Sequence, residues 1–175
     1  NRSNTMSETS KYRHLTTKYC AGNGVDLASG GDPVVPWAIQ VELTEDKYAW
    51  YNSGNKPTSP IQWRGDALDL PFKSNTLDFV YSSHLLEDFA DWTPTLAEWI
   101  RVLKPGGLLV ILIPDKKLWA DALARGQPPN CQHRHEGSAG ELSSYAAGIG
   151  VEVIEDRLTN CFDGDYSIIF AARKK

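Results

Sequence analysis

Apolar residues along the chain gather in seven short runs, separated by segments with helical or turn-rich patterns. These runs predict strands at residues 25–28, 37–43, 61–63, 76–83, 108–113, 151–154 and 167–172. The run 108–113 is apolar at every position, which is typical of a central strand buried on both faces of a sheet.

Helical patterns fill most of the gaps between the predicted strands. The clearest lies at 91–103, where apolar residues recur on one helical face at Leu96, Trp99, Ile100 and Leu103. Thr93, followed by Pro94, is expected to cap this helix, and the Pro-Gly-Gly sequence at 105–107 to end it. Shorter helices are expected at 11–20, 45–51, 116–125 and 141–148.

Strands and helices alternate along most of the chain, which predicts a doubly wound α/β fold with a mostly parallel sheet. The last two predicted strands are joined by the turn-rich segment 160–165, which is too short for a helical crossover. They are therefore expected to form an antiparallel hairpin at the C-terminal end of a seven-stranded sheet. Residues 1–10 are expected to be a flexible N-terminal segment, and residues 11–175 to form one domain.

The composition argues against some classes of protein but does not indicate a function. The net charge of −4 argues against a sequence-independent nucleic-acid binder, which would show a basic footprint. The three cysteines are an odd and widely spread set, which favours a reducing compartment over a disulfide framework. No apolar run is long enough to span a bilayer. We therefore expect a cytoplasmic protein without a membrane partner.

The stretch 24–33 (GVDLASGGDP) places a turn of small residues directly after the first predicted strand. Small side chains let the backbone come close to a ligand. The turn would lie at the carboxyl end of a parallel strand, where open α/β sheets bind ligands. Glu42, at the end of the second predicted strand, is placed to accept hydrogen bonds from both ribose hydroxyls of a nucleotide-like ligand.

Two classes of ligand fit a turn of this kind. A dinucleotide requires Gly-x-Gly-x-x-Gly opening into a helix, whose N-terminus holds the pyrophosphate. Here Asp32 would repel a pyrophosphate, and Pro33 disfavours a long helix directly after the turn. A ligand without phosphate, carrying a sulfonium and an ammonium, tolerates carboxylates such as Asp26 and Asp32 better. The residues therefore favour S-adenosylmethionine over NAD.

Four segments in order carry a set of motifs: 24–31 (GVDLASGG), 40–43 (QVEL), 65–72 (GDALDLPF) and 78–87 (DFVYSSHLLE), the last continuing to 101–107 (RVLKPGG). Together they resemble the class I S-adenosylmethionine-dependent methyltransferases, and within them the methyltransferase type 11 group, over about residues 19–173. The chain departs from the family's first motif at Ala28, where the first glycine usually stands. The resemblance implies a Rossmann-like sheet that ends in the antiparallel hairpin.

The resemblance also implies that S-adenosylmethionine is the cofactor and S-adenosylhomocysteine the product. The backbone around Ala28 and Gly30 would pack against the methionine part, and Glu42 would hold the ribose. Asp66 would accept from the adenine amino group, with the Ala67 amide near the ring. The expected cofactor-binding residues are Asp26, Ala28, Ser29, Gly30, Glu42, Asp66, Ala67, Leu68, Ser82 and Ser83.

The same resemblance places Ser82 to His84 on the floor of the pocket below the reactive methyl group. A base is needed only where the acceptor must lose a proton, and histidine suits this role because its ordinary pKa lies near neutrality. The candidate catalytic residues are His84, His133 and His135. Glu87 and Asp88 are instead expected to be a solvated pair at the start of a helix.

Cys131, His133 and His135 alternate, so in an extended segment they would share one face and could bind zinc. Their spacing is not a standard zinc pattern and no fourth ligand is evident. A loop that faces the substrate is the preferred interpretation, and no metal site is predicted.

The predicted function is transfer of a methyl group from S-adenosylmethionine to a small molecule, such as a sugar-like acceptor. Catalysis would rest largely on holding the nucleophile, methyl group and sulfur in line. The alternative is a non-catalytic methyltransferase-like module that binds the cofactor or its product and acts through a partner protein. An NAD-dependent oxidoreductase is disfavoured by the residues of the turn, and the sequence does not determine the acceptor or the oligomeric state.

Overall fold

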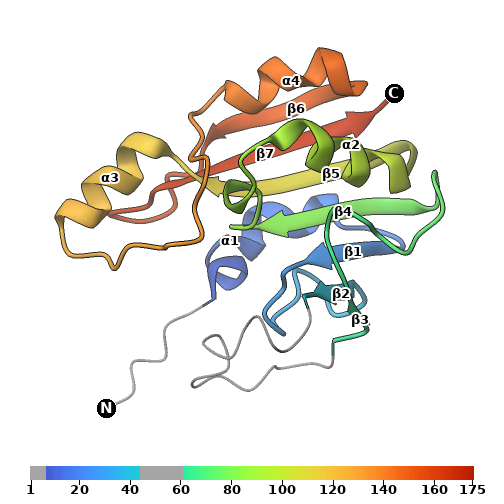
Figure 1. The fold of residues 1–175 in the computed structure, drawn as a ribbon, viewed down its shortest axis with the longest axis horizontal. Helices are drawn as coiled ribbons and strands as arrows, with labels where there is room; N and C mark the ends of the chain where they lie inside the picture. Colours follow the sequence, from blue (N-terminus) through green and yellow to red (C-terminus); the bar gives the residue numbers. More distant parts are fainter. Residues whose placement is uncertain (1–6, 44–60) are drawn as a thin grey trace.

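A seven-stranded sheet runs through the computed structural model, which describes residues 7–43 and 61–175 (Figure 1). Its strands are β1 (Gly24–Leu27), β2 (Ile39–Glu42), β3 (Trp63–Arg64), β4 (Leu77–Ser83), β5 (Leu103–Pro114), β6 (Val151–Leu158) and β7 (Ser167–Lys174). They lie in the order β3-β2-β1-β4-β5-β7-β6. The first five of these are parallel to one another, whereas β7 is antiparallel to both β5 and β6. The predicted α/β class, parallel sheet and C-terminal hairpin are confirmed.

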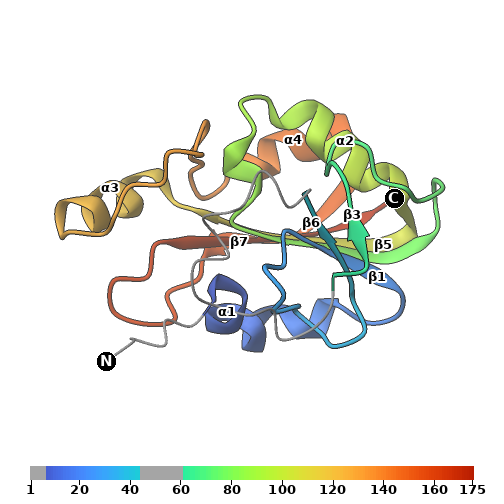
Figure 2. The same cartoon turned by 60° about the horizontal axis from the view of Figure 1, so that its bottom comes forward.

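Helices cover both faces of the sheet. They are α1 (Glu8–Thr16), α2 (Trp92–Val102), α3 (Lys116–Ala124) and α4 (Glu141–Ile149), with short 3-10 turns η1 (Thr17–Tyr19) and η3 (Leu86–Asp88). Figure 2 shows α1 on one face, α2 and α4 on the opposite face, and α3 beyond the end of the sheet. None of the helices within the described ranges is long and apolar enough to cross a membrane. The expected helix at 45–51 lies outside the described residues.

Two helix starts differ from the prediction because polar side chains cap them earlier. Helix α1 begins at Glu8 rather than residue 11, since the Ser7 hydroxyl accepts a hydrogen bond from the Ser10 amide at 3.0 Å. The cap of α2 is Asp91 rather than Thr93, because the Asp91 carboxylate accepts from the Thr93 amide at 2.9 Å. An Asp at the N-cap satisfies an amide that has no partner within the helix.

Strand β5 forms the centre of the core, as its apolar run predicts. Leu109, Ile111 and Ile113 are fully buried in the cluster that contains residues of α2 and α4. Val110 and Leu112 are fully buried on the other face, in the cluster that contains Tyr12 of α1. The strand is longer than predicted and begins at residue 103, because Leu103 already pairs with the start of β4.

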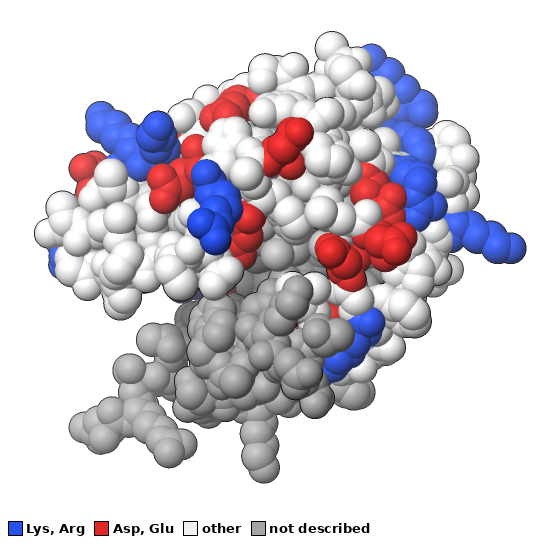
Figure 3. All heavy atoms as spheres, in the orientation of Figure 1, with Lys and Arg blue, Asp and Glu red and all other residues white. Residues whose placement is uncertain are grey.

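Charged side chains of both signs are mixed on the face shown in Figure 3, and Lys and Arg gather mainly along its right-hand edge beside acidic groups. Ion pairs of this kind join Arg101 to Glu98 at 2.7 Å and Lys104 to Asp78 at 2.8 Å. The expectation that nucleic acid is not a partner stays a prediction. The three cysteines, Cys20, Cys131 and Cys161, are free.

Candidate functional site

The turn after β1 adopts a backbone conformation that suits glycine. Ala28, Gly30 and Gly31 have φ values of 59°, 61° and 80°, in the left-handed region. Ala28 is held there because its amide donates to the Val41 carbonyl at 2.8 Å. A residue with a Cβ in this region costs about 1–2 kcal/mol. The departure from the family motif at Ala28 is therefore a matter of backbone strain as well as of side-chain volume.

Glu42 extends from the carboxyl end of β2 to the same turn. One oxygen of its carboxylate, Oε1, accepts from the Gly30 amide and lies 3.4 Å from the Ser29 hydroxyl. Burial raises the pKa of Glu42, although the Gly30 and Ser29 donors act in the opposite direction. The carboxylate is thus fixed against the β1 turn and is not a freely solvated strand-end group.

A pocket opens where β1, β2 and β3 end. It is lined by Ala28, Val41, Glu42, Leu43, Gly65, Asp66, Ala67, Leu68, Leu85 and Phe89. Five of the expected cofactor-binding residues are brought together in it: Ala28, Glu42, Asp66, Ala67 and Leu68. The apolar wall formed by Val41, Leu85 and Phe89 was not predicted. Its sequence signal is the position of these residues directly beside the motifs.

The loop 65–68 is held in place at both ends. The Asp66 carboxylate accepts from the Leu68 amide at 2.9 Å, and the Asp66 carbonyl accepts from the Asp69 amide at 3.1 Å. The indole N–H of Trp99, on α2, donates to the Ala67 carbonyl at 3.0 Å. Asp66 is exposed at the pocket while Ala67 is buried, so the loop presents a carboxylate and a backbone edge to a ligand.

Asp26 lies behind the turn rather than among the residues that line the pocket. It is fully buried, and its Oδ2 accepts from the Val34 amide at 2.7 Å. Burial raises its pKa well above the ordinary value despite this hydrogen bond. Ser29, Gly30, Ser82 and Ser83 also lie outside the pocket lining. Of these, Ser29 and Gly30 contact Glu42 from the turn, which gives them an indirect role at the pocket.

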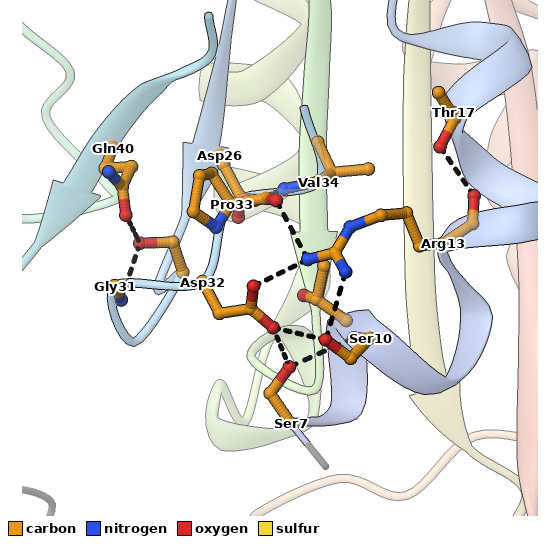
Figure 4. Close-up of polar contacts among 12 residues, drawn as sticks. Ser7, Ser10, Arg13, Thr17, Asp26, Gly31, Asp32, Pro33, Val34 and Gln40 are labelled. Atoms are coloured by element: carbon orange, nitrogen blue, oxygen red, sulfur yellow. Dashed lines mark hydrogen bonds and ion pairs between the residues drawn. The ribbon is translucent and has the colours of Figure 1, made fainter. Parts of the chain in front are cut away.

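Asp32 fastens the β1 turn to α1 (Figure 4). Its carboxylate accepts from the hydroxyls of Ser7 and Ser10 and from the Arg13 guanidinium at 2.6 Å. Arg13 also donates to the Pro33 carbonyl at 3.1 Å. Burial alone would raise the pKa of Asp32, but these hydrogen bonds outweigh it and lower the pKa. Asp32 is therefore an anchor between the turn and the first helix.

His84 follows β4 in a left-handed conformation, with φ of 54°. Its Nδ1 lies 3.1 Å from the Ser83 hydroxyl and its Nε2 lies 3.0 Å from the Ser167 hydroxyl. The ring stacks against Tyr12 of α1 at a centroid distance of 6.2 Å. Burial lowers the pKa of His84, which favours the neutral imidazole. Both ring nitrogens are thus engaged by hydroxyl groups.

His133 and His135 face different surroundings, so they do not share one face with Cys131 as they would in an extended segment. The physical reason is that this segment is not a strand: residues 131 and 132 lie in a turn and residue 134 lies in a bend. His135 stacks on Trp92 at 4.0 Å and lies 2.8 Å from Glu141 Oε1, whereas Cys131 is exposed. Within the described ranges, no group of three or more potential ligands is arranged to hold a metal.

His133 instead points to Glu87, which was expected to be solvated. Glu87 is fully buried, and its Oε1 lies 3.6 Å from His133 Nε2. The other ring nitrogen, Nδ1, lies 3.5 Å from Glu136 Oε1. Burial raises the pKa of Glu87 well above its ordinary value and lowers that of His133. The apolar neighbours Leu86 and Phe89 were the sequence signal for this burial.

Comparison with known proteins gives a family match in the middle of the chain. Residues 34–111 match the family model described as a methyltransferase domain. A demethylmenaquinone methyltransferase from Streptomyces avermitilis is 38% identical over 116 residues, covering 62% of this chain and 48% of that protein. One from Staphylococcus saprophyticus is 48% identical over 75 residues, covering 42% and 32%. The chain spans about half or less of the length of these curated relatives.

Solved structures share the fold over nearly the whole chain. An S-adenosylmethionine-dependent methyltransferase from Methanosarcina mazei has a TM-score of 0.63 at 14% identity, covering 91% of this chain and 96% of that one. One from Aquifex aeolicus has a TM-score of 0.58 at 19% identity, covering 86% and 80%. The match of residues 34–111 to the methyltransferase domain and the fold shared with these structures agree with the motifs of the sequence.

Proposed function

We propose that this protein transfers a methyl group from S-adenosylmethionine to a small-molecule acceptor. The observation that carries the proposal is the position of Glu42. Its carboxylate is fixed by the β1 turn and lines the same pocket as Ala28 and the 65–68 loop. A half-buried carboxylate beside a close backbone approach suits a ribose diol, because it offers only acceptors to the two hydroxyl donors.

The residues of the pocket fit the parts of the cofactor one by one. Glu42 would hold the ribose, Asp66 would accept from the adenine amino group, and the Ala67 backbone would lie along the ring. The turn at Ala28 would contact the methionine part, with Leu85 and Phe89 as an apolar wall. Bound there, S-adenosylmethionine supplies an electrophilic methyl group on a positively charged sulfur.

The choice among the three candidate bases favours His133. His84 has a hydroxyl at each ring nitrogen, and His135 is stacked on Trp92 and bonded to Glu141. His133 lies between two carboxyl groups at 3.5 and 3.6 Å, and burial lowers its pKa, which favours the neutral imidazole that can accept a proton. We assign it the role of proton acceptor for acceptors that must lose a proton.

The names of the relatives indicate a demethylmenaquinone as one acceptor to test, since demethylmenaquinone methyltransferases match part of this chain. A sugar-like acceptor stays a second one to test. The alternative of a non-catalytic module predicts the same cofactor binding without turnover. Transfer of labelled methyl to an extracted small-molecule fraction separates these two functions.

Calorimetric titration with S-adenosylhomocysteine, S-adenosylmethionine and NAD tests the proposal. We expect the two sulfur nucleosides to bind and NAD not to bind. Glu42→Ala should weaken their binding about 10- to 100-fold, because hydrogen bonds to a charged group contribute about 1.5–3 kcal/mol. Glu152→Gln, at a carboxylate that is 66% exposed, is the matched control and should bind as the parent does. Binding of NAD alone would overturn the proposal.

A further inference from the structure

Beyond the Leu85 end of the cofactor pocket, six side chains form what we call the acidic aromatic cluster. They are Glu8, His84, Glu87, Trp119, His133 and Tyr166. They come from α1, from the segment after β4, from α3, from the loop before α4 and from the residue before β7. The cluster therefore lies where the carboxyl ends of β4 and β5 meet the amino end of β7.

Three aromatic rings of the cluster pack in a chain. The Trp119 ring lies 5.0 Å from that of Tyr166 and 5.2 Å from that of His133. Trp119 and Tyr166 are buried in a small cluster of their own, separate from the main core. The faces of such rings carry negative potential and attract cations.

The carboxyl group of Glu87 is the exceptional member of the cluster. It is fully buried, and neither oxygen has a hydrogen-bond partner among the described residues. His133 Nε2 lies 3.6 Å from Glu87 Oε1, and no Lys or Arg of residues 7–43 and 61–175 forms an ion pair with Glu87. Buried polar groups without partners are rare in folded proteins, and each calls for an explanation.

Glu8, which belongs to α1, resembles Glu87 in that one of its two carboxylate oxygens is buried and unpaired among the described residues. Its Oε1 is held by Lys11 at 2.7 Å and by the Tyr166 hydroxyl at 3.2 Å. Its Oε2 is buried without a hydrogen-bond partner among the described residues and lies 3.9 Å from His84 Nε2. With its side chain 31% exposed, Glu8 is the member through which the cluster reaches the surface.

From this geometry we propose that the acidic aromatic cluster binds the ammonium group of the methyl acceptor, as a protonated amine or a quaternary ammonium. The proposal rests on the proposed function for the identity of the ligand as acceptor, and it narrows that acceptor to a molecule that carries an ammonium group, in place of a demethylmenaquinone or a neutral sugar. A cation placed among these groups would pair with the orphaned carboxyl of Glu87 and the second oxygen of Glu8. It would also face the rings of Trp119, Tyr166 and His133.

The electrostatics of the cluster agree with a cationic ligand. Burial raises the pKa of Glu87, and Asp88, Glu8 and Glu136 add to the effect by repulsion. A cation bound beside Glu87 would lower the pKa of this carboxyl group, against the effects of burial and repulsion, because it favours the ionised carboxylate. An anionic acceptor would meet the same carboxylates and be repelled.

The test uses choline and its uncharged carbon isostere, 3,3-dimethylbutan-1-ol, titrated into the protein saturated with S-adenosylhomocysteine. We expect choline to bind at least about tenfold more tightly than the alcohol, since a desolvated cation is attracted by the faces of aromatic rings and an uncharged isostere is not. Glu87→Gln and Glu8→Gln should each remove most of this preference while leaving the affinity for the alcohol unchanged. The exposed Glu152→Gln variant should keep it.

A second readout places the ligand. The chain has four histidines, and choline should shift the ring signals of His84 and His133 in NMR spectra but not that of His14. Equal binding of choline and the alcohol, or no binding of choline to a folded protein, would overturn the proposal. Loss of S-adenosylhomocysteine binding would count against the proposed cofactor instead, and the choline titration of the protein alone would still decide this inference.

Discussion

The candidate site has two halves: the pocket beside Glu42, which we call the cofactor half, and the acidic aromatic cluster, which we call the acceptor half. They differ in the hydrogen bonds that their acidic side chains accept. On the cofactor side, Glu42 accepts from the Gly30 amide, and Asp26 accepts from the Val34 amide through Oδ2 while its Oδ1 is buried without a partner among the described residues. On the acceptor side, Glu87 is buried with no hydrogen-bond partner among the described residues. The difference is that each acid of the cofactor half is held by at least one backbone amide, whereas both oxygens of Glu87 are left for a ligand to complete.

The largest stability effect is expected from removing the hydrogen bond between Asp26 and the Val34 amide in the cofactor half. Asp26→Leu removes the acceptor of the buried Val34 amide and adds volume to a closed space. We expect it to lower the free energy of unfolding by about 2–4 kcal/mol, measured by urea denaturation. Asp26→Asn keeps an acceptor oxygen and is the control. Equal loss in both variants would show that charge, and not the hydrogen bond, is what matters.

The acceptor half should respond in the opposite direction. Because the pKa of Glu87 is raised in the folded protein, the folded state holds its proton more tightly than the unfolded chain does. The cost to stability is absent below the ordinary pKa of 4.5 and grows as pH rises towards the raised value. Glu87→Gln should therefore stabilise the ligand-free protein by about 1–3 kcal/mol near pH 8.

At pH 4 the same substitution should change stability little, and this pH dependence is the control for Glu87→Gln. Glu152→Gln, at an exposed carboxylate, should be neutral at both values of pH. Urea denaturation curves of the three proteins at the two pH values make the comparison. A destabilising effect of Glu87→Gln at pH 8 would mean that Glu87 is satisfied in solution.

Substitution of Asp32, which joins α1 to the β1 turn, tests whether ligand binding in the cofactor half depends on the first helix. Asp32→Ala leaves the Arg13 guanidinium and two serine hydroxyls without their shared acceptor. We expect a loss of about 1–2 kcal/mol in unfolding free energy. The affinity for S-adenosylhomocysteine should fall as well, because the turn loses its support. Unchanged affinity would show that the turn holds its shape without α1.

The smallest effect is expected at Ala28. Ala28→Gly relieves a left-handed alanine but makes the unfolded chain more flexible, so the net gain in stability should be about 0.5–1 kcal/mol. The matched control is Ala97→Gly on the exposed face of α2, which should cost about 1 kcal/mol. Thermal unfolding of both variants gives the comparison, and a loss in both would contradict the strain assigned to Ala28.

The sequence was informative where structure depends on neighbouring residues. The continuous run of β5 and the antiparallel hairpin follow from local pattern. The contact of Glu42 with the Gly30 amide was not predicted. Juxtapositions of distant segments were not predictable. Nothing near Glu87 in the chain indicates that His133 will lie beside it, because turns decide which way the loop's histidines point.

Helix caps and buried acidic residues also depend on contacts that the local sequence does not determine. Asp91, not Thr93, caps α2, since both residue types cap well and only the path of the chain selects between them. Glu87 was expected in solvent because acidic residues are rarely buried without a partner. A buried acidic residue without a partner lowers stability, and such exceptions are expected at functional sites.

The central claim is that the two halves bind different ligands. The direct measurement is a set of calorimetric titrations in which the parent, Glu42→Ala and Glu87→Gln proteins each receive S-adenosylhomocysteine and choline. We predict that Glu42→Ala loses affinity for S-adenosylhomocysteine and keeps choline, while Glu87→Gln loses choline and keeps S-adenosylhomocysteine. Variants that lose both ligands together, or neither, would contradict the division of the site into a cofactor half and an acceptor half.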